Sequence, residues 1–250
     1  MRIDKYMADA GLAVSRSKAQ EMLKDGCVTV DGVPVDKASF EIEGGMQVLV
    51  KENPLQRYVG RGGLKLEAAL DAFGLSPEGQ IALDVGASSG GFTDCLLKRG
   101  AAFVYAVDSG TGQLHPSLLA DERVLSMENT NARTLTKDFF DKTPTFAVMD
   151  VSFISQTLIL PAIRVSMSKG GTLISLIKPQ FELGRGAIGK GGIVKSEKLA
   201  KTAVTRVCDV AKALGFRLLG HIPSPIRGGD GNLEFLAAFA LNAQTEETYE

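Results

Sequence analysis

Four charged residues stand at or near the ends of apolar runs in this sequence: Asp84, Asp108, Asp150 and Lys178. The runs have the length and β-branched content of buried parallel strands. Ligands of parallel sheets bind outside the carboxyl ends of the strands, so we expect these side chains to share one cleft. Lys178 precedes Pro179, which fixes the backbone there and would let the amine emerge into that cleft.

The chemistry available to such a lysine is proton removal. A sugar hydroxyl is a poor nucleophile until a base takes its proton, and a lysine beside another cation loses its own proton more readily. When the second reactant carries a good leaving group, correct placement and a base are sufficient. We expect no metal, because the sequence has no C-x-x-C pair or histidine cluster with metal-ligand spacing.

Residues 81–109, IALDVGASSGGFTDCLLKRGAAFVYAVDS, run in the order strand, glycine turn, helix, strand and acid. This order is typical of the first βαβ unit of a nucleotide-type site. Glycines in the turn let the backbone come close to a ligand, since any Cβ would occupy that space. Asp108, at the tip of the second strand, is placed to accept hydrogen bonds from ribose hydroxyls.

The spacing of the turn favours S-adenosylmethionine (SAM) over a dinucleotide. The turn lacks the G-x-G-x-x-G pattern that holds a pyrophosphate, and Asp84-x-Gly86-x-x-x-Gly90 suits a loop around an amino acid and a nucleoside. The predicted cofactor contacts in this stretch are Asp84, Gly86, Ala87, Ser88, Ser89, Gly90, Gly91, Phe92 and Asp108.

Two other interpretations of the turn remain open. The first is a glycine turn with a purely structural role. The second is a hydrolase nucleophile elbow, because residues 86–90 also match G-x-S-x-G. In that case Ser88, Asp150 and His221 would follow the chain order of a Ser-Asp-His triad.

The composition is that of an ordinary globular chain. Its 250 residues are 44% hydrophobic and 23% charged with a net charge of −1, so any nucleic-acid site must be a local patch. The 3 cysteines are scattered, as is typical of reduced thiols. The N-terminus has charges where a signal peptide needs an apolar core, and no apolar stretch reaches the ~18–20 residues that span a bilayer. We therefore expect a cytoplasmic protein with no membrane segment.

Strands and helices alternate after residue 80, which predicts an α/β fold with a Rossmann-like, mostly parallel sheet and a late antiparallel strand. The predicted strands are 81–85, 103–107, 124–127, 145–149, 172–177, 216–222 and 232–241, the last of which carries Glu234. Helical patterns cover 92–100 and 198–215. Residues 184–195 have five glycines and three cations, which indicates either disorder or a lid over a polyanion.

Residues 1–52 are predicted to form a separate small α+β module. A helix beginning at Arg2 ends near Gly11, and Ser15 is a natural N-cap for a second helix over 16–24. Strands follow at 28–30, 33–35 and 47–50. We place a linker at 53–63, where Pro54 excludes the centre of a strand, and a second domain at 64–250.

The first module resembles the S4 RNA-binding domain through the ordered patterns R-x-D-K-Y-x-x-x-x-G, S-R-S-x-A and G-x-V-x-V-D-G. The resemblance implies a face that contacts structured RNA, with candidate phosphate contacts at Arg2, Lys5, Arg16, Lys18 and Lys24. Charge alone favours a solvated face, because residues 1–65 carry ten Lys/Arg against nine Asp/Glu. Asp4, Asp9 and Glu21 could simply pair with the cations. Phosphate contacts would make binding fall steeply with salt.

The second domain resembles the RrmJ/FtsJ family of RNA ribose 2′-O-methyltransferases, whose Lys-Asp-Lys-Glu tetrad maps onto GGLKLE, MDVSF, IKPQFE and NLEF. The resemblance implies that Lys178 takes the proton, helped by Asp150, while Lys65 and Glu234 position the ribose. Asn131 stands where FtsJ-type enzymes often have Asp near the adenine, and it joins Asp150 among the predicted cofactor contacts. Arg61, Arg185 and Lys190 are further candidates for RNA contact.

An S4 module fused to this domain resembles the TlyA (haemolysin A-like) group over nearly the whole chain. The stretches RGGLKLEAAL, LDVGASSGGFTD, KPQFELGRGAIGKGGIV and SPIRGGDGN carry this likeness. The resemblance implies SAM as cofactor and ribosomal RNA in ribosomal subunits as the partner, with methylation of cytidine 2′-hydroxyls. We expect a monomer. The alternatives are an S4-type RNA-binding protein with an inactive methyltransferase-like domain and a membrane-active haemolysin.

Overall fold

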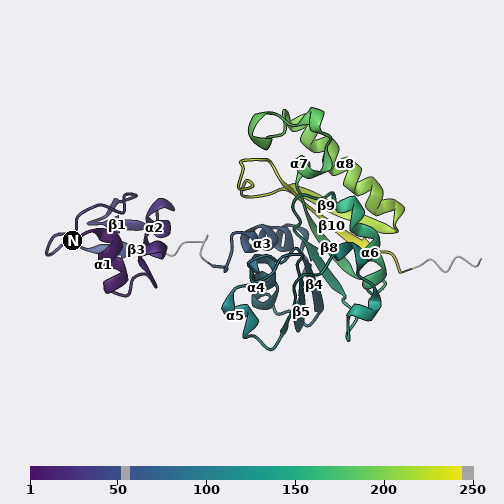
Figure 1. Cartoon of the computed structure of the whole chain (residues 1–250), viewed down its shortest axis with the longest axis horizontal. Coiled ribbons are helices and arrows are strands. Elements are labelled where there is room, and N and C mark those ends of the chain that lie inside the picture. The colour runs from purple at the N-terminus through teal and green to yellow at the C-terminus, as the bar shows by residue number, and fades with distance from the viewer. Residues whose placement is uncertain (52–56, 244–250) are drawn as a thin grey trace, which may run out of the picture. The chain divides into compact units, whose positions relative to one another are not determined.

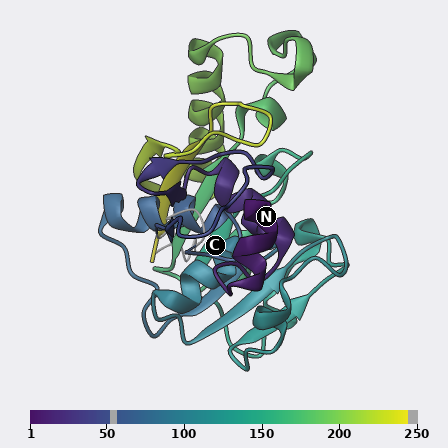
Figure 2. The same cartoon turned by 90° about the vertical axis from the view of Figure 1, so that its left-hand side faces the viewer.

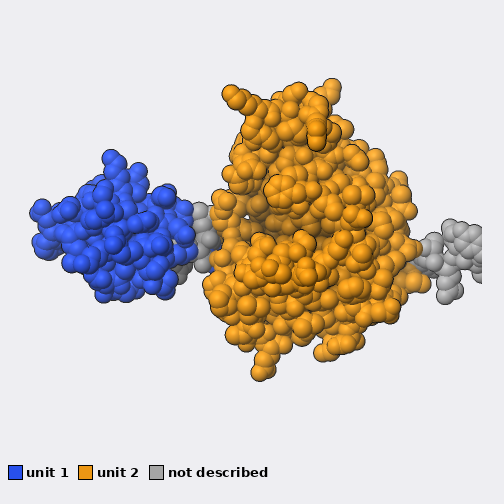
Figure 3. Space-filling view, in the orientation of Figure 1, with its two compact units in different colours: residues 1–57 blue, residues 58–250 orange. Residues whose placement is uncertain are grey.

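The chain forms two compact units in a computed structural model that describes residues 1–51 and 57–243 (Figure 1). Unit 1 comprises Met1–Arg57 and unit 2 comprises Tyr58–Glu250 (Figure 3). Of the predicted linker over 53–63, residues 53–56, with Pro54, lie outside the described residues. Residues 58–63 belong to unit 2, where Tyr58 is buried and the Val59 N–H donates to Asp94 Oδ2 at 2.8 Å.

Unit 1 packs two short helices on a small antiparallel sheet with the strand order β2-β1-β3. Ser15 caps the second helix as predicted, because its Oγ accepts from the Lys18 N–H at 3.2 Å. Apolar residues at helical spacing, such as Ile3, Met7 and Leu23, are fully buried against the sheet. The elements of unit 1 are α1 (Ile3–Asp9), α2 (Arg16–Lys24), β1 (Val28–Val30), β2 (Val33–Pro34) and β3 (Val48–Val50).

Unit 2 is built on a 7-stranded sheet with the order β6-β5-β4-β7-β8-β10-β9. Its strands are β4 (Ile81–Val85), β5 (Phe103–Val107), β6 (Val124–Met127), β7 (Phe146–Met149), β8 (Thr172–Ile177), β9 (Phe216–Pro223) and β10 (Phe235–Leu241). Its helices are α3 (Gly62–Phe73), α4 (Gly91–Lys98), α5 (Pro116–Leu119), α6 (Leu160–Ser166), α7 (Pro179–Glu182) and α8 (Glu197–Ala213). The pairs among β4 to β8 are parallel, and β10 is antiparallel to both β8 and β9. The predicted fold class is therefore confirmed.

Helices cover both faces of this sheet (Figure 1). Alternate residues of β4 show why: Leu83 joins the core under α6 and α8, while Ala82 joins the core under α3 and α4. Both residues are fully buried. A strand buried on its two faces appears in the sequence as a continuous apolar run, which is the pattern on which the prediction depended.

Two predicted elements differ in the structure. The last strand begins at Phe235, so Glu234 precedes it instead of lying within it. The reason is local: the Ser224 N–H donates to the Glu234 carbonyl at 2.8 Å and the Gly228 N–H donates to the Asn232 carbonyl at 3.1 Å, which closes residues 224–234 into a loop.

Residues 184–195 are also ordered, which contradicts the disorder alternative and leaves the lid over a polyanion as a prediction. They form two 3₁₀ turns, Arg185–Ala187 and Lys190–Gly192, with a bridge between Ile188 and Val194. The buried side chain of Asn232 holds this segment, donating to the Gly192 carbonyl and accepting from the Val194 N–H, each at 3.0 Å. The connection between α7 and α8 projects from the sheet in both views (Figure 1; Figure 2).

Candidate active site

The four predicted catalytic side chains form two ion pairs at the end of the unit 2 sheet where β7 and β8 finish. Lys178 Nζ lies 2.6 Å from Asp150 Oδ1, and Lys65 Nζ donates to Glu234 Oε2 at 2.6 Å. The Lys65–Glu234 pair is the more buried, with side-chain exposures of 11% and 3%. The Lys178–Asp150 pair is more open, at 13% and 21%. Each amine therefore faces a carboxylate at short range.

The sheet topology explains this convergence. Asp150 follows β7 and Lys178 follows β8, and these two strands are parallel neighbours. The antiparallel register of β10 and β8 pairs Phe235 with Ile177, so Glu234 and Lys178 lie opposite each other just beyond these paired residues. Lys65 comes from the first turns of α3, which packs against β10. Three strands and one helix thus supply one group each.

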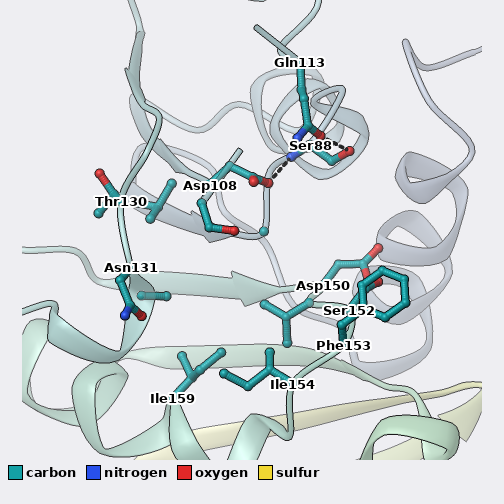
Figure 4. Close-up of a pocket in the computed structure, with 15 residues that line it drawn as sticks. Ser88, Asp108, Gln113, Thr130, Asn131, Asp150, Ser152, Phe153, Ile154 and Ile159 are labelled. Atoms are coloured by element: carbon teal, nitrogen blue, oxygen red, sulfur yellow. Dashed lines mark hydrogen bonds between the residues drawn. The ribbon is translucent and has the colours of Figure 1, made fainter. Parts of the chain in front are cut away.

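Two cavities meet beside the Lys178–Asp150 pair, whereas Lys65 and Glu234 line neither of them. The larger, of about 380 Å³, lies over the ends of β4, β5 and β7 and is lined by the Asp108, Asn131 and Asp150 side chains (Figure 4). The smaller, of about 190 Å³, is lined by Arg61 and Lys178. Gly86, Ser88, Asp150 and Ser152 line both cavities. A ligand that fills the larger cavity would therefore contact Asp150 directly and reach Lys178 through the smaller cavity.

Most of the predicted cofactor residues line these cavities. Gly86, Ser88, Asp108, Asn131 and Asp150 line the larger one, and Gly86, Ala87, Ser88, Ser89, Gly91, Phe92 and Asp150 line the smaller one. Asp108 accepts from the Ser88 N–H at 2.8 Å and from the Gly110 N–H at 2.7 Å. A carboxylate offers about four lone-pair sites, so capacity remains for hydroxyls of a ligand.

Two predicted contacts, Gly90 and Asp84, lie behind the loop and do not line either cavity. Gly90 is the N-cap of α4 with a φ of +95°, and a Cβ there would overlap the Leu118 side chain. Its glycine is required by packing and by backbone conformation. The sequence pattern could not separate this role from ligand contact, because both need a residue without a side chain.

Asp84 is fully buried beneath the loop. Its Oδ2 accepts from Thr93 Oγ1 at 2.6 Å, whereas Oδ1 has no hydrogen-bond partner within the part of the chain that the structure describes. Burial first, and then the nearby Asp150 carboxylate, raise the pKa of Asp84 to about 7 against the lowering effect of the Thr93 hydrogen bond. A cationic ligand near this carboxyl would favour its ionised form.

The hydrolase interpretation of G-x-S-x-G is wrong for this geometry. Ser88 follows β4 and donates from its Oγ to Gln113 Oε1 at 3.1 Å. His221 lies on β9, and β7, β8 and β10 separate β9 from β4 in the sheet. The three residues therefore cannot form a triad, although Ser88 does have the φ of +47° that a tight strand-to-helix turn imposes.

Phe153 is a feature of the site that the sequence analysis missed. It lines the larger cavity, has a φ of +65° and is 91% exposed. Its ring contacts Phe181 at a centroid distance of 5.1 Å (Figure 4 shows Phe153 beside Ser152). A large aromatic side chain held in the left-handed region at the mouth of a cavity is uncommon. An apolar residue in a segment without periodicity gave no signal for this position.

Two of the five RNA candidates of unit 1, Arg2 and Arg16, gather around one buried carboxylate. Asp4 Oδ2 accepts from Gln20 Nε2 at 2.8 Å, from Arg16 Nη2 at 3.0 Å and from Arg2 Nη2 at 3.2 Å. These hydrogen bonds, that of Gln20 first, hold the pKa of Asp4 well below its usual range. The Arg2 and Arg16 side chains remain 48% and 54% exposed. The predicted pairing of Asp4 with cations of unit 1 is therefore present. It orders Arg2 and Arg16 and leaves about half of each side chain exposed to solvent.

The remaining RNA candidates occupy several surfaces. Lys18 donates to Glu21 at 3.0 Å, as the solvated-face alternative predicts. Arg61 borders the smaller cavity. The other candidates are exposed: Lys5 and Lys24 in unit 1, and Arg185 and Lys190 in the segment between α7 and α8.

The described residues contain neither a group of three or more His, Cys, Asp or Glu that could hold a metal ion nor a helix long and apolar enough to cross a membrane.

Comparison with known proteins places this site in a family. The family model for the FtsJ-like methyltransferase matches residues 58–241, and the model for the S4 domain matches residues 1–48. Hemolysin A of Brachyspira hyodysenteriae is 44% identical over 96% of this chain and 100% of its own length. The 16S/23S rRNA (cytidine-2'-O)-methyltransferase TlyA of Mycobacterium tuberculosis (strain CDC 1551 / Oshkosh) is 41% identical over 98% of this chain and 91% of its own length.

A solved structure from Streptococcus thermophilus, named as a candidate hemolysin, is 44% identical and has a TM-score of 0.76. That match covers 97% of this chain and 88% of the other. The matched methyltransferase model includes both cavities and all four groups of the two ion pairs. The chain therefore belongs to the FtsJ-like methyltransferase family and carries an S4 domain at its N-terminus.

Proposed function

We propose that this protein transfers a methyl group from SAM to a cytidine 2′-hydroxyl of ribosomal RNA. The observation that carries the proposal is the Lys178–Asp150 pair at the junction of two cavities, the larger of which suits a nucleoside, with Glu234 of the Lys65–Glu234 pair opposite Lys178 in the register of β10 and β8. The relative from Mycobacterium tuberculosis is named for this reaction on 16S and 23S rRNA. Its near full-length match supports the same substrate class here, and with it a cytoplasmic site of action on ribosomal subunits.

The larger cavity fits the nucleoside part of SAM. Asp108 would accept from the ribose hydroxyls, and Asn131, Ile154 and Ile159 would border the base. Beneath the loop, Asp84 Oδ1 has no hydrogen-bond partner among the described residues and burial raises the pKa of this carboxyl to about 7, so a cationic ligand bound nearby would favour its ionised form. When bound, SAM supplies a methyl group on a sulfonium, which is a good leaving group.

The side chains of this chain then provide a base and a position. Lys178, reacting as the neutral amine, is the group that accepts the 2′-hydroxyl proton and becomes the ammonium, which Asp150 at 2.6 Å and Ser152 Oγ at 2.8 Å from its Nζ then stabilise. Lys65 and Glu234 orient the ribose through hydrogen bonds to its oxygens. The exposed face of Phe153 offers a stacking surface for the base that accompanies this ribose, since base–aromatic stacking contributes ~1–3 kcal/mol per base.

Residues 1–52 act as the RNA-docking domain in this proposal, and residues 64–250 carry the reaction. The arginine pair on Asp4 gives unit 1 a local positive site despite its near-neutral charge. Each guanidinium has five N–H donors, so Arg2 and Arg16 keep donors for phosphate oxygens after binding Asp4. Arg61, Arg185 and Lys190 would extend the contact on unit 2.

Replacing Asp4 by asparagine is expected to weaken binding of ribosomal RNA about tenfold, the effect of losing roughly 1.4 kcal/mol of aligned contacts. An asparagine cannot accept from all three side chains, so both arginines lose their alignment. Net charge argues the opposite, because removing an acid should tighten binding to RNA. Affinities of the full chain measured against salt concentration decide between the two.

The matched control for this prediction is Asp9→Asn, which makes the same charge change at an exposed position of α1. It should bind RNA equally well or slightly better than the unmodified chain. If Asp4→Asn behaves like Asp9→Asn while both remain folded, Asp4 does not position the arginines for RNA.

The test of the proposed function is tritiated methyl transfer from SAM to ribosomal subunits and to naked ribosomal RNA, followed by mapping of the modified ribose. The expected product is a 2′-O-methylcytidine in one or both subunits. Tight RNA binding with no methyl transfer to any of these substrates would leave only an RNA-docking protein with an inactive second domain.

A further inference from the structure

Two short segments present the Lys178–Asp150 pair. One is residues 150–156, which run from the end of β7 to the 3₁₀ turn at Gln156–Leu158 and contain no other helix or strand. The other is residues 178–182, in which Lys178 is the N-cap of the four-residue helix α7. The distance between base and carboxylate therefore depends on how these two segments are held together.

The segments contact each other along their whole length. At one end Lys178 faces Asp150 and Ser152, and in the middle the Phe181 ring lies against Phe153. At the other end Glu182 closes the contact. Its Oε2 accepts from Ser155 Oγ at 2.6 Å and its Oε1 accepts from the Gln156 N–H at 2.8 Å.

The type and burial of Glu182 are specific for this contact. The residue is 3% exposed, so its two acceptor oxygens face protein donors instead of water. A carboxylate is the side chain that can accept two hydrogen bonds from one position on opposite oxygens. Its backbone carbonyl also accepts from Arg206 Nη1 of α8 at 2.7 Å, which fixes the end of α7 to a long helix.

The partner segment is anchored at the same point. The Gln156 side chain donates from Nε2 to the Leu176 carbonyl of β8 and accepts from Ser175 Oγ at Oε1. All of these groups are buried. Residues 155–156 are thus held between β8 and Glu182, which anchors the far end of the segment that begins at Asp150.

We infer that Glu182 is a positioning residue for methyl transfer. By tying residues 155–156 to α7, it keeps Lys178 Nζ and the Asp150 carboxylate at their separation of 2.6 Å. This inference rests on the proposed function. Glu182 lines neither cavity. Its removal leaves the Lys178 and Asp150 side chains unchanged but takes away one of the two anchors of the segment that carries Asp150 and Phe153.

The experiment compares Glu182→Ala, Ser155→Ala and Glu182→Gln in the full chain. We expect Glu182→Ala to lower kcat about 100-fold, because a misplacement of a reacting group by ~1 Å can lower the rate of reaction by about that factor. The KM for SAM should change less than threefold, as Glu182 lies outside the cavities. Ser155→Ala, which removes one of the two hydrogen bonds, should show a smaller loss of kcat.

Glu182→Gln is the conservative variant that should restore most of the rate. Its amide oxygen can accept from the Gln156 N–H, and the Ser155 hydroxyl can accept from the amide nitrogen while it donates to Thr157 Oγ1, 2.7 Å away. Val207→Ala, a cavity variant in the fully buried part of α8, serves as the control for lost stability. It should melt earlier with kcat unchanged.

Equal kcat for Glu182→Ala and the unmodified chain, at equal folded fraction, overturns the inference. So does a loss that Glu182→Gln fails to restore while remaining folded, or a loss that Val207→Ala reproduces. Absence of methyl transfer by the unmodified chain is a different result, since it removes the proposed function and not the positioning role alone.

Discussion

Lys178→Ala should abolish methyl transfer to ribosomal RNA while leaving SAM binding nearly intact. General-base catalysis contributes roughly 10²–10⁴-fold, and this side chain is the amine that borders the smaller cavity beside Asp150. Single-turnover transfer of a tritiated methyl group measures the rate, and calorimetric titration with SAM measures cofactor affinity. The expected outcome is loss of rate with a Kd for SAM within about threefold of the unmodified value.

Lys178→Arg sharpens this experiment. An arginine keeps the positive charge opposite Asp150 but does not give up its proton under ordinary conditions. If only the positive charge of Lys178 mattered, this variant would stay active. If Lys178 is the base, Lys178→Arg should be as inactive as Lys178→Ala. Lys212→Ala, an exposed lysine on α8, is the control. Retained turnover in Lys178→Ala would remove Lys178 as the base.

Glu234→Leu should lose both activity and much of the stability of unit 2. The change leaves the Lys65 ammonium buried without its carboxylate, and breaking a buried ion pair from one side costs about 3–5 kcal/mol. Denaturant unfolding of the full chain, followed through unit 2, measures the loss. Methyl transfer is measured at a temperature where the variant is still folded.

The double variant Lys65→Met with Glu234→Leu separates the two effects. It removes both charges, and apolar replacements of a buried pair are often neutral or stabilising by ~1–4 kcal/mol. Stability should therefore recover. Activity should not, because the groups that orient the ribose are gone. Recovery of both properties would mean that the pair serves the fold and not the reaction.

The sheet of unit 2 was predictable because its strands are buried on both faces. Continuous apolar runs such as 81–85 and 172–177 appear as β4 and β8 with unchanged bounds. The ends of the apolar runs also located Asp150 and Lys178, since a charged residue directly after a buried parallel strand lies at the carboxyl end of that strand. Local rules also held at Ser15, whose capping bond depends only on neighbouring residues.

The rest of the site could not be read from local patterns. Glu234 came from family resemblance, and its position before β10 depends on hydrogen bonds within residues 224–234 and on the contacts of Asn232 with Gly192 and Val194. Phe153 gave no signal, because exposure and a positive φ are properties of the folded chain. Net charge suggested no RNA site in unit 1, because the count of charges does not reveal that Asp4 gathers two arginines on one side.

The antiparallel pairing of β10 with β8 has a consequence for how this chain can vary. Side chains of a strand alternate between faces, so a slip of one residue in the Phe235–Ile177 register would turn Glu234 away from Lys65. An insertion within 225–230 lengthens a surface loop and leaves the register intact. An insertion between 235 and 241 moves the carboxylate. Length differences among relatives should therefore occur within 225–230 and be absent between 235 and 241.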